Sequence, residues 1–324
     1  MIIKRQIDQP SSFSIKTPFL PQDQRQRKTF QPFSYKDIAV FIGSDFLFSG
    51  VLIGVKPSVS ATEKSLNISG YSKAAVLNDC NVSISSFPVE YNQVGLFEIS
   101  KNLAFPFGVR VEFEADQQAV FDKVALTPEK KVLGFLATLA QQRNGVFGDN
   151  EQGALVFRQA TKFGSPVAKF KKGFPPVKSI TPAFNEQEYY SEISGIASSG
   201  FGGAGSTYTS KNPFLNAKRT FTFKAKDSKD GNLKTAVEAK IGLMFANAVS
   251  YKVEVSTWRD PSGQIWKPNT TVLIQDENAM IFEETEMLIK SVELRKDKNS
   301  ESAVLDLVLE GSYSGKIPER LPWL

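Results

Sequence analysis

The stretch 251–312 constrains the fold of this 324-residue chain more than any other, because its side chains alternate over most of its length. Tyr251, Val253 and Val255 are separated by Lys252 and Glu254. A period of two is typical of a strand with one buried face. The segments 270–274, 286–294 and 303–309 repeat the pattern, so the sequence predicts a series of antiparallel strands with no catalytic loop among them.

A tight turn interrupts this stretch at Asp260-Pro261-Ser262-Gly263. Asp at the first position, Pro at the second and Gly at the last are typical of a type I turn. Trp258 and Trp266 flank the turn, and their spacing predicts a pair of tryptophans facing each other across a hairpin. Such a pair has two interpretations: packing within the hairpin, or a carbohydrate-binding surface of an adhesin.

The N-terminal half divides into a β-rich part and a mixed part. Residues 1–36 are rich in Pro, Gln and Arg and are predicted to form an extended arm or loop, with 12–16 as one strand. A hairpin is expected over 38–55, where Gly50 and Gly54 indicate a bulge or a close approach of two backbones. A strand over 65–70 follows.

The mixed part, about 87–160, is predicted to hold two helices and a hairpin. Asn92 is a candidate N-cap for a helix that ends near Leu103. Thr127 followed by Pro128 favours a second helix start, and Gly145 suits the position after its end. A hairpin is expected over 146–159.

The remaining segments are predicted from their composition. Residues 164–181 are rich in Pro, Lys and Gly and are interpreted as a linker. Strands are expected over 189–197 and 219–226, and a helix over 233–248. The glycine-rich segment 198–207 lacks the Lys-Ser/Thr ending of a phosphate-binding loop, so we interpret it as an insertion. The last residues, 313–324, are expected to form an arm that docks on a neighbouring molecule.

Composition excludes several classes of catalytic site. The chain has no histidine and a single cysteine, Cys80, which removes Ser-His-Asp and Cys-His catalysis, an internal disulfide and a structural zinc site. The net charge of +5 is mild and its basic residues are dispersed, unlike the concentrated basic face of most nucleic-acid-binding proteins. No apolar run reaches the length of a signal peptide or a membrane helix, and folding in a reducing cytoplasm is expected.

A hydrolase that uses two carboxylates is the enzymatic alternative, because this chemistry needs no histidine. The densest acidic run is Glu283, Glu284 and Glu286. Adjacent residues of a strand point to opposite faces, so the run fits a solvated turn better than a catalytic pair. The sequence therefore predicts no catalytic, cofactor-binding or metal-binding residues and no cofactor.

Short motifs in a fixed order resemble a known family. The order is FSGVLIGVKPS, LNISGYSKAAVLNDC, EISKNLAFPFGVRV, LTPEKKVLGFLATLAQQRNGVFGDNEQGALVF and VSTWRDPSGQIWKPNTTVLI, followed by EMLIKSVELRKD and AVLDLVLEG. The most specific marks are Gly70-Tyr71-Ser72 with Asp79-Cys80, and the hairpin from Trp258 to Asn269. Over roughly 38–311 the chain resembles the baseplate hub proteins of contractile-tailed bacteriophages, the Mu-like hub and late-control protein D group.

The resemblance implies a mainly β fold with an α+β insert: two tail-tube-like β-barrel domains and a peripheral αβ module. The implied domains are 1–86, a first tube-like domain with an N-terminal arm; 87–181, the αβ module and linker; 182–312, a second tube-like domain with helix 233–248; and 313–324, a C-terminal arm. The hairpin at Trp258 is then a structural signature of the second domain and not a binding site.

The resemblance also implies a function without catalysis. Three copies form a ring that adapts the sixfold tail tube to the threefold central spike and leaves a channel for DNA ejection. The implied partners are two further copies of the chain, the tail tube protein, the central spike protein, the tape-measure protein and other baseplate wedge proteins. DNA is met in transit only, and no membrane insertion is expected. The implied location is the virion tail baseplate, assembled in the host cytoplasm.

One expectation follows from the channel itself. Because Lys and Arg contacts to phosphate would hold DNA back, we expect acidic or neutral side chains to face the channel. The basic residues of 162–178 and 218–234 are expected mainly on outer surfaces or between subunits.

Overall fold

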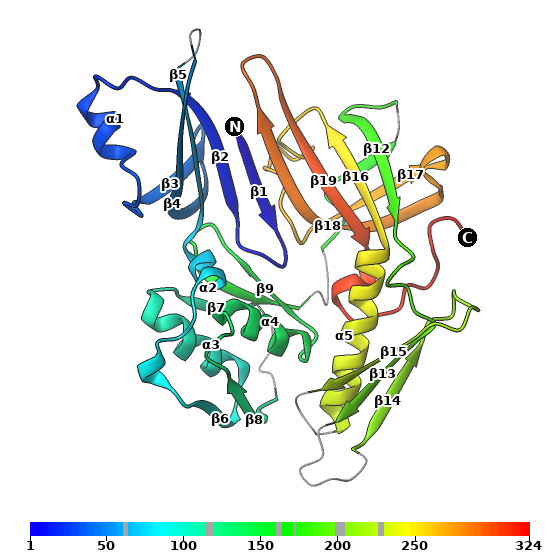
Figure 1. Ribbon diagram of the computed structural model, residues 1–324. Helices are drawn as coiled ribbons and strands as arrows, with labels where there is room; N and C mark the ends of the chain where they lie inside the picture. Colours follow the sequence, from blue (N-terminus) through cyan, green and yellow to red (C-terminus); the bar gives the residue numbers. More distant parts are fainter. Residues whose placement is uncertain (61–63, 115–118, 160–163, 172, 198–204, 226–229) are drawn as a thin grey trace.

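Alternating strands build one large antiparallel sheet in the computed structural model, which describes residues 1–60, 64–114, 119–159, 164–171, 173–197, 205–225 and 230–324 (Figure 1). Nine strands of this sheet follow a single path in the order β12-β16-β19-β18-β1-β2-β5-β4-β3. Their bounds, in that order, are Val177–Phe184, Val249–Val255, Glu301–Leu309, Ile281–Lys296, Ile2–Gln6, Ser12–Pro18, Lys64–Ser72, Asp45–Val59 and Asp37–Ile42. The prediction of a mainly β chain is confirmed.

The N-terminal residues join the two halves of this sheet. Strand β1 pairs with β18 in the register Ile2↔Arg295 and Lys4↔Glu293, and with β2 on its other side. The prediction of an extended arm over 1–36 is therefore wrong for β1, whereas the strand expected over 12–16 is present as β2. Strand β1 pairs with a strand nearly 300 residues away, a pairing that local sequence does not encode. Residues 19–36, with the short helix α1 (Gln24–Thr29), do project from the sheet.

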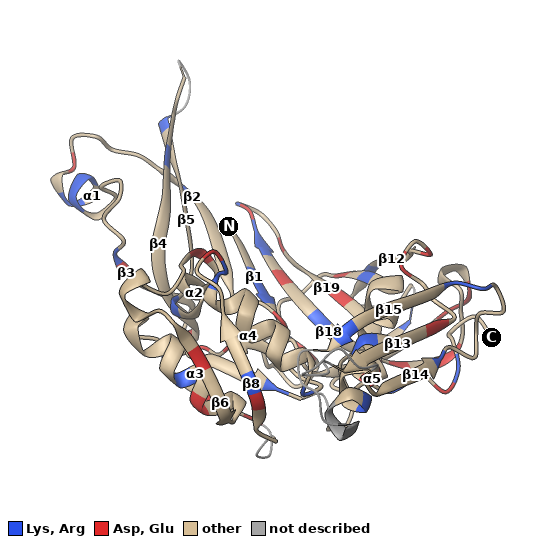
Figure 2. Cartoon of the chain, turned by 60° about the horizontal axis from the view of Figure 1, so that its bottom comes forward, with Lys and Arg blue, Asp and Glu red and all other residues tan. Residues whose placement is uncertain are grey.

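The path of the sheet is open. Strands β12 and β3 stand at its two ends, and among the described residues no strand pairs with the outer edge of either. The strands β11 (Lys169–Lys171) and β17 (Thr271–Asp276) pair with each other off this path, and β17 also pairs with β18. Neither half of the sheet closes into a barrel within this part of the chain. The resulting shape is a curved band of strands (Figure 2).

The predicted linker over 164–181 is wrong where β11 and β12 form. Lys169, Phe170 and Lys171 pair in parallel with β17, and β12 pairs with β16 through Ile180↔Val253 and its neighbours. Pro182 is tolerated in β12 because an edge strand needs hydrogen bonds on one side only. The Pro and Lys content that suggested a loop is therefore that of an edge strand.

Helix α5 (Asp230–Ala248), which the apolar spacing predicted over 233–248, leads directly into β16 and lies below the second half of the sheet (Figure 1). Val237, Ile241 and Phe245 are fully buried in the same cluster as Tyr251 and Val253. A small sheet packs on the other end of this helix and has the order β14-β13-β15, with bounds Thr207–Lys211, Glu192–Ala197 and Thr220–Ala225. The glycine-rich segment lies largely outside the described residues, at 198–204.

The αβ module has its own core beneath the first half of the large sheet. Its elements are α2 (Val76–Asp79), β6 (Val89–Val94), α3 (Leu96–Ala104), β7 (Val111–Phe113), β8 (Phe121–Leu126), α4 (Val132–Gln141), β9 (Val146–Asp149) and β10 (Leu155–Arg158). The hairpin of β9 and β10 is as predicted, and β10 also pairs in parallel with β7. Short 3₁₀ turns lie at 73–75, 84–86, 105–107, 277–279 and 310–313.

Both predicted helix starts in this module are placed too early. Asn92 lies in β6, opposite Lys123 of β8, and α3 begins after Gly95. Helix α4 begins after Lys131, four residues beyond the predicted cap. In both cases a contact with another segment of the chain determines where the helix begins. Pairing with β8 keeps Asn92 extended, so α3 begins after it. The carbonyl of Cys80 accepts the N–H of Val132 at 3.1 Å, which satisfies a backbone donor in the first turn of α4.

The C-terminal segment packs on its own chain, contrary to the predicted docking on a neighbour. Leu321 is buried in the main core, and the Trp323 ring contacts Phe184 with centroids 5.0 Å apart. The Tyr313 hydroxyl donates to Asp8 at 3.0 Å. Apolar residues at a chain end are equally suited to an intramolecular and an intermolecular contact, which is why the sequence alone did not separate them.

Candidate functional site: the polar face of the sheet

One face of the nine-stranded path is lined by polar side chains from edge to edge. Residues that pair across neighbouring strands share a face, so the register identifies its members row by row. The longest row is Ser179, Glu254, Val304, Glu293, Lys4, Ser12, Tyr71, Val51 and Asp37. Every one of these side chains is exposed or half-buried, whereas the alternate residues, such as Val253, Leu305 and Ile3, are buried.

Three further rows are also mostly polar, and all their side chains except that of Ser291 are exposed or half-buried. One contains Ser302, Arg295, Ile2, Ser14, Ser69 and Gly54. The second contains Thr181, Lys252, Asp306, Ser291 and Gln6, and the third Lys16, Asn67 and Lys56. Serine is the commonest residue over these four rows, and Tyr71 is their one aromatic residue. Most of these positions are therefore small or polar.

Opposite charges lie close together on this face. Lys4 is paired with Glu293 across β1 and β18, and Lys252 with Asp306 across β16 and β19. Arg295 donates to Glu293 at 2.7 Å. Figure 2 shows the resulting alternation of basic and acidic bands along β1, β18 and β19. The face carries charge of both signs at short range, so no single sign dominates it.

Asp306 is the most buried carboxylate of the face. Burial raises its pKa, and the neighbouring ammonium groups of Lys290, Lys252 and Lys4 oppose that rise. Burial outweighs the lysines, so the pKa of Asp306 stays raised, and its Oδ1 atom is buried without a hydrogen-bond partner in the described part of the chain.

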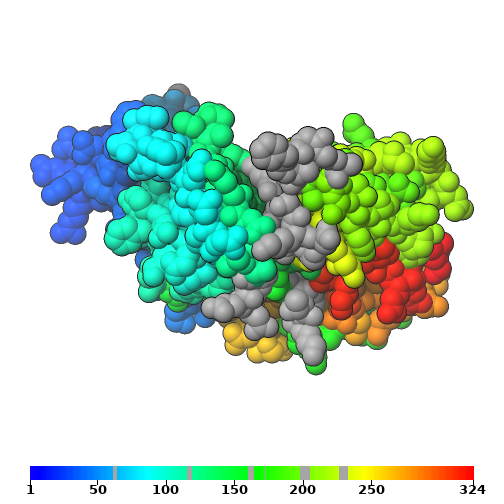
Figure 3. All heavy atoms as spheres, turned by 90° about the horizontal axis from the view of Figure 1, so that it is seen from below, coloured from blue at the N-terminus to red at the C-terminus, as the bar shows by residue number. Residues whose placement is uncertain are grey.

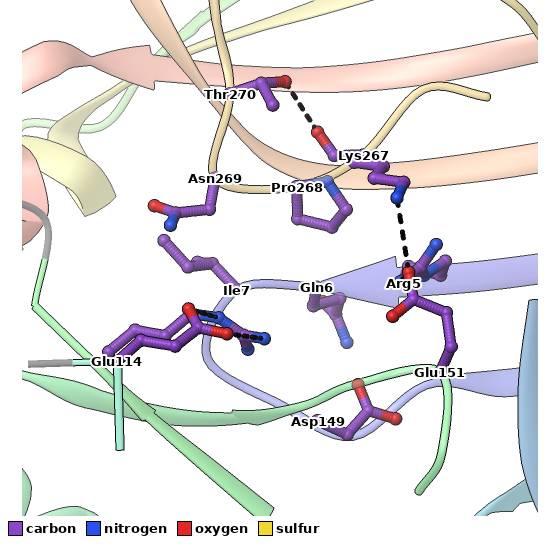
Figure 4. Close-up of a pocket in the computed structure, with 11 residues that line it drawn as sticks. Arg5, Gln6, Ile7, Glu114, Asp149, Glu151, Lys267, Pro268, Asn269 and Thr270 are labelled. Carbon is purple, nitrogen blue, oxygen red and sulfur yellow. Dashed lines mark hydrogen bonds and ion pairs between the residues drawn. The ribbon is translucent and has the colours of Figure 1, made fainter. Parts of the chain in front are cut away.

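A cleft of about 240 Å³ lies where the αβ module meets the large sheet (Figure 4). The Arg5 guanidinium of β1 donates to the Glu151 carboxylate at 2.9 Å, and Lys267 lies 3.5 Å from the same carboxylate. On the module side, Arg158 donates to Glu114 at 2.8 Å. These residues come from three separated parts of the chain, so the cleft is an ionic junction between them.

The carboxylates of the junction are bound in different ways. Burial raises the pKa of Asp149, although it accepts hydrogen bonds from the Ser11 N–H (2.8 Å) and the Ser11 hydroxyl (3.0 Å). Burial also opposes ionisation of Glu151, but the charges of Arg5 and Lys267 outweigh it and lower the Glu151 pKa. Each carboxylate is thus held by groups of the chain itself. The arrangement stabilises the contact between the module and the sheet.

The two tryptophans predicted to face each other, Trp258 and Trp266, are buried within the chain. Trp258 is 4% exposed and its indole N–H donates to the carbonyls of Arg295 and Ser302, at 3.0 and 2.9 Å. Trp266 is 1% exposed and packs edge-on against Phe170 at 5.7 Å. The two tryptophans do oppose each other, since the Trp266 N–H donates to the Trp258 carbonyl at 3.0 Å. Neither ring is presented to a ligand, so the carbohydrate-binding interpretation loses its motivation.

The turn between the tryptophans is confirmed. The Gly263 N–H donates to the Asp260 carbonyl at 2.9 Å, and Gly263 has a φ of +84°. The Asp260 carboxylate accepts from the backbone N–H groups of Ser262 and Gln264.

The three glutamates of the acidic run lie on β18, and each contacts a different partner. Glu283 pairs with Arg320, Glu284 with Lys169, and Glu286 accepts from the Thr271 hydroxyl at 2.6 Å. These contacts are those of a surface strand. Over the described residues, no group of three or more acidic or cysteine side chains has the arrangement of a metal site, and no helix is long and apolar enough to cross a membrane.

Sequence reasoning missed the polar face as a unit. The part of the face on β16, β18 and β19 was visible as alternation in 251–309, but β1 was assigned to an arm, and the strand expected over 12–16 was given no partner. The alternation of Lys4 and Gln6 with Ile3 and Arg5, and of Ser12 and Ser14 with Phe13, was the signal available in the N-terminal residues.

Comparison with known proteins matches this architecture to phage tail proteins. Residues 74–159, the αβ module, match the family model described as baseplate hub protein gp44-like, second domain. The chain is 24% identical to the baseplate hub protein gp44 of Escherichia phage Mu over 280 residues, which cover 80% of this chain and 71% of that protein. The resemblance to the Mu-like baseplate hub proteins is confirmed.

Two solved structures share the fold over almost the whole chain. The 43 kDa tail protein of prophage MuSo2 from Shewanella oneidensis is 22% identical, with a TM-score of 0.78, over 96% of this chain and 94% of that one. The tail protein from Neisseria meningitidis MC58 is 16% identical, with a TM-score of 0.80, over 98% and 93%. The likeness therefore extends beyond the αβ module to the large sheet.

Proposed function

We propose that this chain is a structural baseplate hub protein of a phage contractile tail and a component of the virion. Three copies form a ring that joins the sixfold tail tube to the threefold central spike. The ring leaves a channel for DNA ejection, and the chain catalyses no reaction. The family match of the αβ module, the likeness to the Mu hub protein and the shared fold of tail proteins support this proposal.

The open sheet with one polar face is the observation that carries the proposal. An open sheet ends in strands whose N–H and C=O groups are available on one side, and such edges pair readily with another chain. In a trimer, three sheets of two halves each place six half-sheets around one axis. In this arrangement each half-sheet belongs to one tube-like barrel domain of the ring. The four polar rows face the central channel. Of the domain limits proposed from the sequence, 1–86, 87–181, 182–312 and 313–324, the one at 181 falls inside β12 (Val177–Phe184), so we propose that β11 and β12 belong to the second tube-like domain.

The chemistry of the polar face suits a channel through which DNA moves. Phosphates are held by concentrated Lys and Arg, and each such contact strengthens binding and slows release. Here Lys4 and Lys252 lie beside Glu293 and Asp306, so the field at the face is weak. The basic residues described within 162–178 and 218–234 are absent from the four rows, in keeping with the proposed outer or inter-subunit location.

The proposal includes the partners of such a ring. The tail tube protein stacks above it, the central spike protein below it, and the tape-measure protein occupies the channel before ejection. Baseplate wedge proteins surround it. Assembly takes place in the host cytoplasm, with no insertion into a membrane.

Imaging of the purified protein tests the proposal. The full chain, at tens of micromolar and with the spike protein present, is examined by negative-stain microscopy and by size measurement in solution. We expect rings with threefold symmetry and a central hole. Monomers that never form rings under these conditions would contradict the proposal.

A further inference from the structure

The two halves of the large sheet repeat one arrangement of strands. The first half has the order β2-β5-β4-β3, and the second has β16-β19-β18, with β17 paired to β18. Strands β4 and β18 have 15 and 16 residues, and β5 and β19 have nine each. In both halves the four strands follow one another along the chain, occupy corresponding places in the sheet and are antiparallel to one another.

The two halves also share their register. The pair Gly54↔Ser69 of the β4–β5 hairpin corresponds to Ser291↔Asp306 of the β18–β19 hairpin, because each is the first pair beyond a register shift. The last pairs before the two hairpin loops are equivalent as well: Val59↔Lys64 and Lys296↔Glu301. A matching irregularity within matching strands identifies the two halves as a structural repeat.

The repeat includes the residues that precede β3 and β17. The N–H of Leu52 in β4 donates to the Lys36 carbonyl at 2.9 Å, and the N–H of Ile289 in β18 donates to the Thr270 carbonyl at 2.8 Å. In each half the residue just before that carbonyl has a positive φ, 45° in the first half and 64° in the second. Pairing with β3 or β17 ends at this level in both halves. Beyond it, the outer edge of β4 or β18 needs another strand as its partner.

In the second half, β1 is that partner. Strand β18 pairs with β1 from Ser291 to Arg295. The equivalent part of β4, residues 54–58, pairs with β5 on one side, and no described strand pairs with its other side. Residues 31–35 line a cavity of about 450 Å³ together with residues 52–56 of β4 and part of β5. The first half therefore lacks, within one chain, the strand that β1 supplies to the second half.

Strand β12 is the counterpart of β1 in the repeat. Strand β1 pairs antiparallel with β2, and β12 pairs antiparallel with β16. Ile2 lies opposite Ser14, and Thr181 lies opposite Lys252. These two partners pair in turn with the equivalent residues of β5 and β19, so Ile2 and Thr181 stand at the same level of the repeat. The outer edge of β1 pairs with β18, whereas no described strand pairs with the outer edge of β12.

We infer that β12 of one copy of this chain pairs with residues 54–59 of β4 in the next copy, as β1 pairs with β18 within a chain. The internal pair Ile2↔Arg295 gives the register between copies, in which Thr181 lies opposite Ser58. Both of these side chains are exposed in the single chain. This pairing rests on the proposed ring and gives it a defined contact between subunits.

The two edges lie at opposite ends of one molecule. Strand β12 stands at one end of the nine-strand path, and β3 with the open part of β4 stands at the other (Figure 1). Figure 3 likewise shows N-terminal residues, in blue, at one end and C-terminal residues, in red and orange, at the other. A chain therefore does not pair its own two edges, and their contact is heterologous. Contacts of this kind close into a ring when the rotation between copies closes.

A proline lies at the same level on each of the two edges. Ile3 and Leu294 form a hydrogen-bonded level of the internal pairing, because Ile7, whose N–H points the same way along the alternating strand, donates to β18 at 3.0 Å. The equivalents of Ile3 and Leu294 are Pro182 and Pro57, and neither has an N–H to donate. Prolines on open edges hinder pairing with other strands. The pairing between copies therefore lacks two hydrogen bonds that the internal pairing has.

Disulfide formation tests the register. Thr181 and Ser58 face each other at a level without hydrogen bonds, where opposite Cα atoms are about 4.5 Å apart and a disulfide fits. In a Cys80→Ser background, a chain with Thr181→Cys is mixed with a chain with Ser58→Cys and oxidised. We expect a covalent dimer only when both variants are present. Ala183→Cys, displaced by two residues along β12, is expected to link to Ser58→Cys at least about tenfold more slowly.

The internal pairing supplies the matched control for this experiment. Ile2→Cys and Arg295→Cys, placed in one chain of the same Cys80→Ser background, stand at the equivalent level of β1 and β18. We expect them to form a disulfide within the chain, without linking one chain to another. Mass spectrometry of the oxidised proteins distinguishes the two kinds of disulfide.

The prolines give a second readout. Pro57→Val with Pro182→Val restores two N–H groups, and we expect the association of the full chain, measured by sedimentation, to strengthen about tenfold. Val55→Pro removes an N–H that points away from β5 and is expected to weaken association at least about tenfold. Val55→Ala keeps that N–H and is the control, with unchanged association expected. Because the altered N–H positions lie on outer edges, these variants keep the fold, which circular dichroism verifies.

The outcomes separate the pairing from the ring. Rings that form without the disulfide between Thr181→Cys and Ser58→Cys, and whose association is insensitive to the proline variants, overturn the pairing and leave the ring intact. Preferred linkage of Ala183→Cys to Ser58→Cys overturns the inferred register. Linked chains that grow into open filaments support the pairing and overturn the ring. Absence of any association, while the internal control forms its disulfide, overturns both.

Discussion

The two halves of the large sheet present the same polar face but bury their other face differently. The second half, β12, β16, β18 and β19, packs against helix α5 and the hairpin with Trp258 and Trp266, and most of its large side chains are buried, with Phe184 and Phe282 as exceptions. The first half, β2 to β5, buries Phe48 and Leu52 but leaves exposed Phe41, Ile53 and, beyond the strands, Phe33 and Tyr35. Both halves therefore expose some apolar surface, and they differ in that the second half buries more aromatic rings within the chain.

This difference indicates which interactions stabilise each half of the sheet. Buried aromatic residues stabilise the second half through packing within the chain. The first half relies on closely approaching strands: a Cβ added at Gly50 would lie 2.2 Å from the Tyr71 carbonyl oxygen. The predicted close approach at Gly50 and bulge at Gly54 are both confirmed, the latter by a register shift between Leu52 and Gly54.

The largest effect is expected for Trp266→Ala in the second half. Removing this fully buried ring creates a cavity beside Phe170 and abolishes the hydrogen bond to the Thr257 carbonyl. We expect a loss of about 3–5 kcal/mol in the free energy of unfolding, measured by urea denaturation. Phe33→Ala in the first half is the contrast and should change it by less than about 0.5 kcal/mol. Equal losses would break the comparison.

Gly50→Ala tests the first half by steric crowding. The added methyl group would overlap the Tyr71 carbonyl, so β4 and β5 must separate. We expect a destabilisation of about 1–3 kcal/mol. Gly134→Ala, in α4, meets no atom within 4 Å and serves as the control, with no loss of stability expected. A neutral Gly50→Ala would mean that the strands pack less closely than described.

Glu151→Gln tests the ionic junction between the αβ module and β1, the strand that joins the two halves of the large sheet. It leaves the nearly buried Arg5 guanidinium without its ion-pair partner. Because Glu151 is partly exposed, we expect a loss of about 1–2 kcal/mol, below that of a fully buried pair. Lys123→Gln breaks the exposed pair with Glu90 and should cost less than about 0.5 kcal/mol. Thermal unfolding of the four proteins, including Glu90→Gln and wild type, makes the comparison.

The pH dependence of the same junction has a definite sign. The pKa of Glu151 is lowered in the folded chain, so its ionised form stabilises the fold at pH values above the ordinary glutamate pKa of about 4.3. That stabilisation is lost as the pH falls through the lower folded pKa. The difference in unfolding free energy between wild type and Glu151→Gln should therefore be constant near neutral pH and shrink below about pH 4. A difference that grows on acidification would contradict this sign.

The smallest effect is expected on the shared polar face. Ser302→Arg and Ser179→Arg add charge at exposed or half-buried positions and should alter stability by less than about 0.5 kcal/mol. They should nevertheless raise affinity for double-stranded DNA, with a steeper dependence on salt, since each new cation contacts phosphate. Filter binding at two salt concentrations measures both quantities, and Ser179→Asn and Ser302→Asn are neutral controls.

Local sequence was sufficient where a segment carries its own signal. The alternation over 251–309, the turn Asp260–Gly263 and the helix ending at Ala248 needed only side-chain period and turn chemistry, and all are present in the fold. The motifs also sufficed for the likeness to the hub proteins, because short sequences in a fixed order survive at low identity. The polar character of one face of the strands between 249 and 309 is likewise encoded in the local alternation of side chains.

Tertiary structure decided what depends on distant partners. Strand β1, predicted as part of an arm, pairs with β18 and joins the two halves of the sheet. Pairing with β8 keeps Asn92 in a strand. The contact of Val132 with the Cys80 carbonyl places the start of α4 after the predicted residue. Backbone hydrogen bonds between residues far apart in the chain are not encoded in any window of sequence, because a strand finds its partner only as the chain folds. For the same physical reason, the continuous polar face emerged only from the three-dimensional fold.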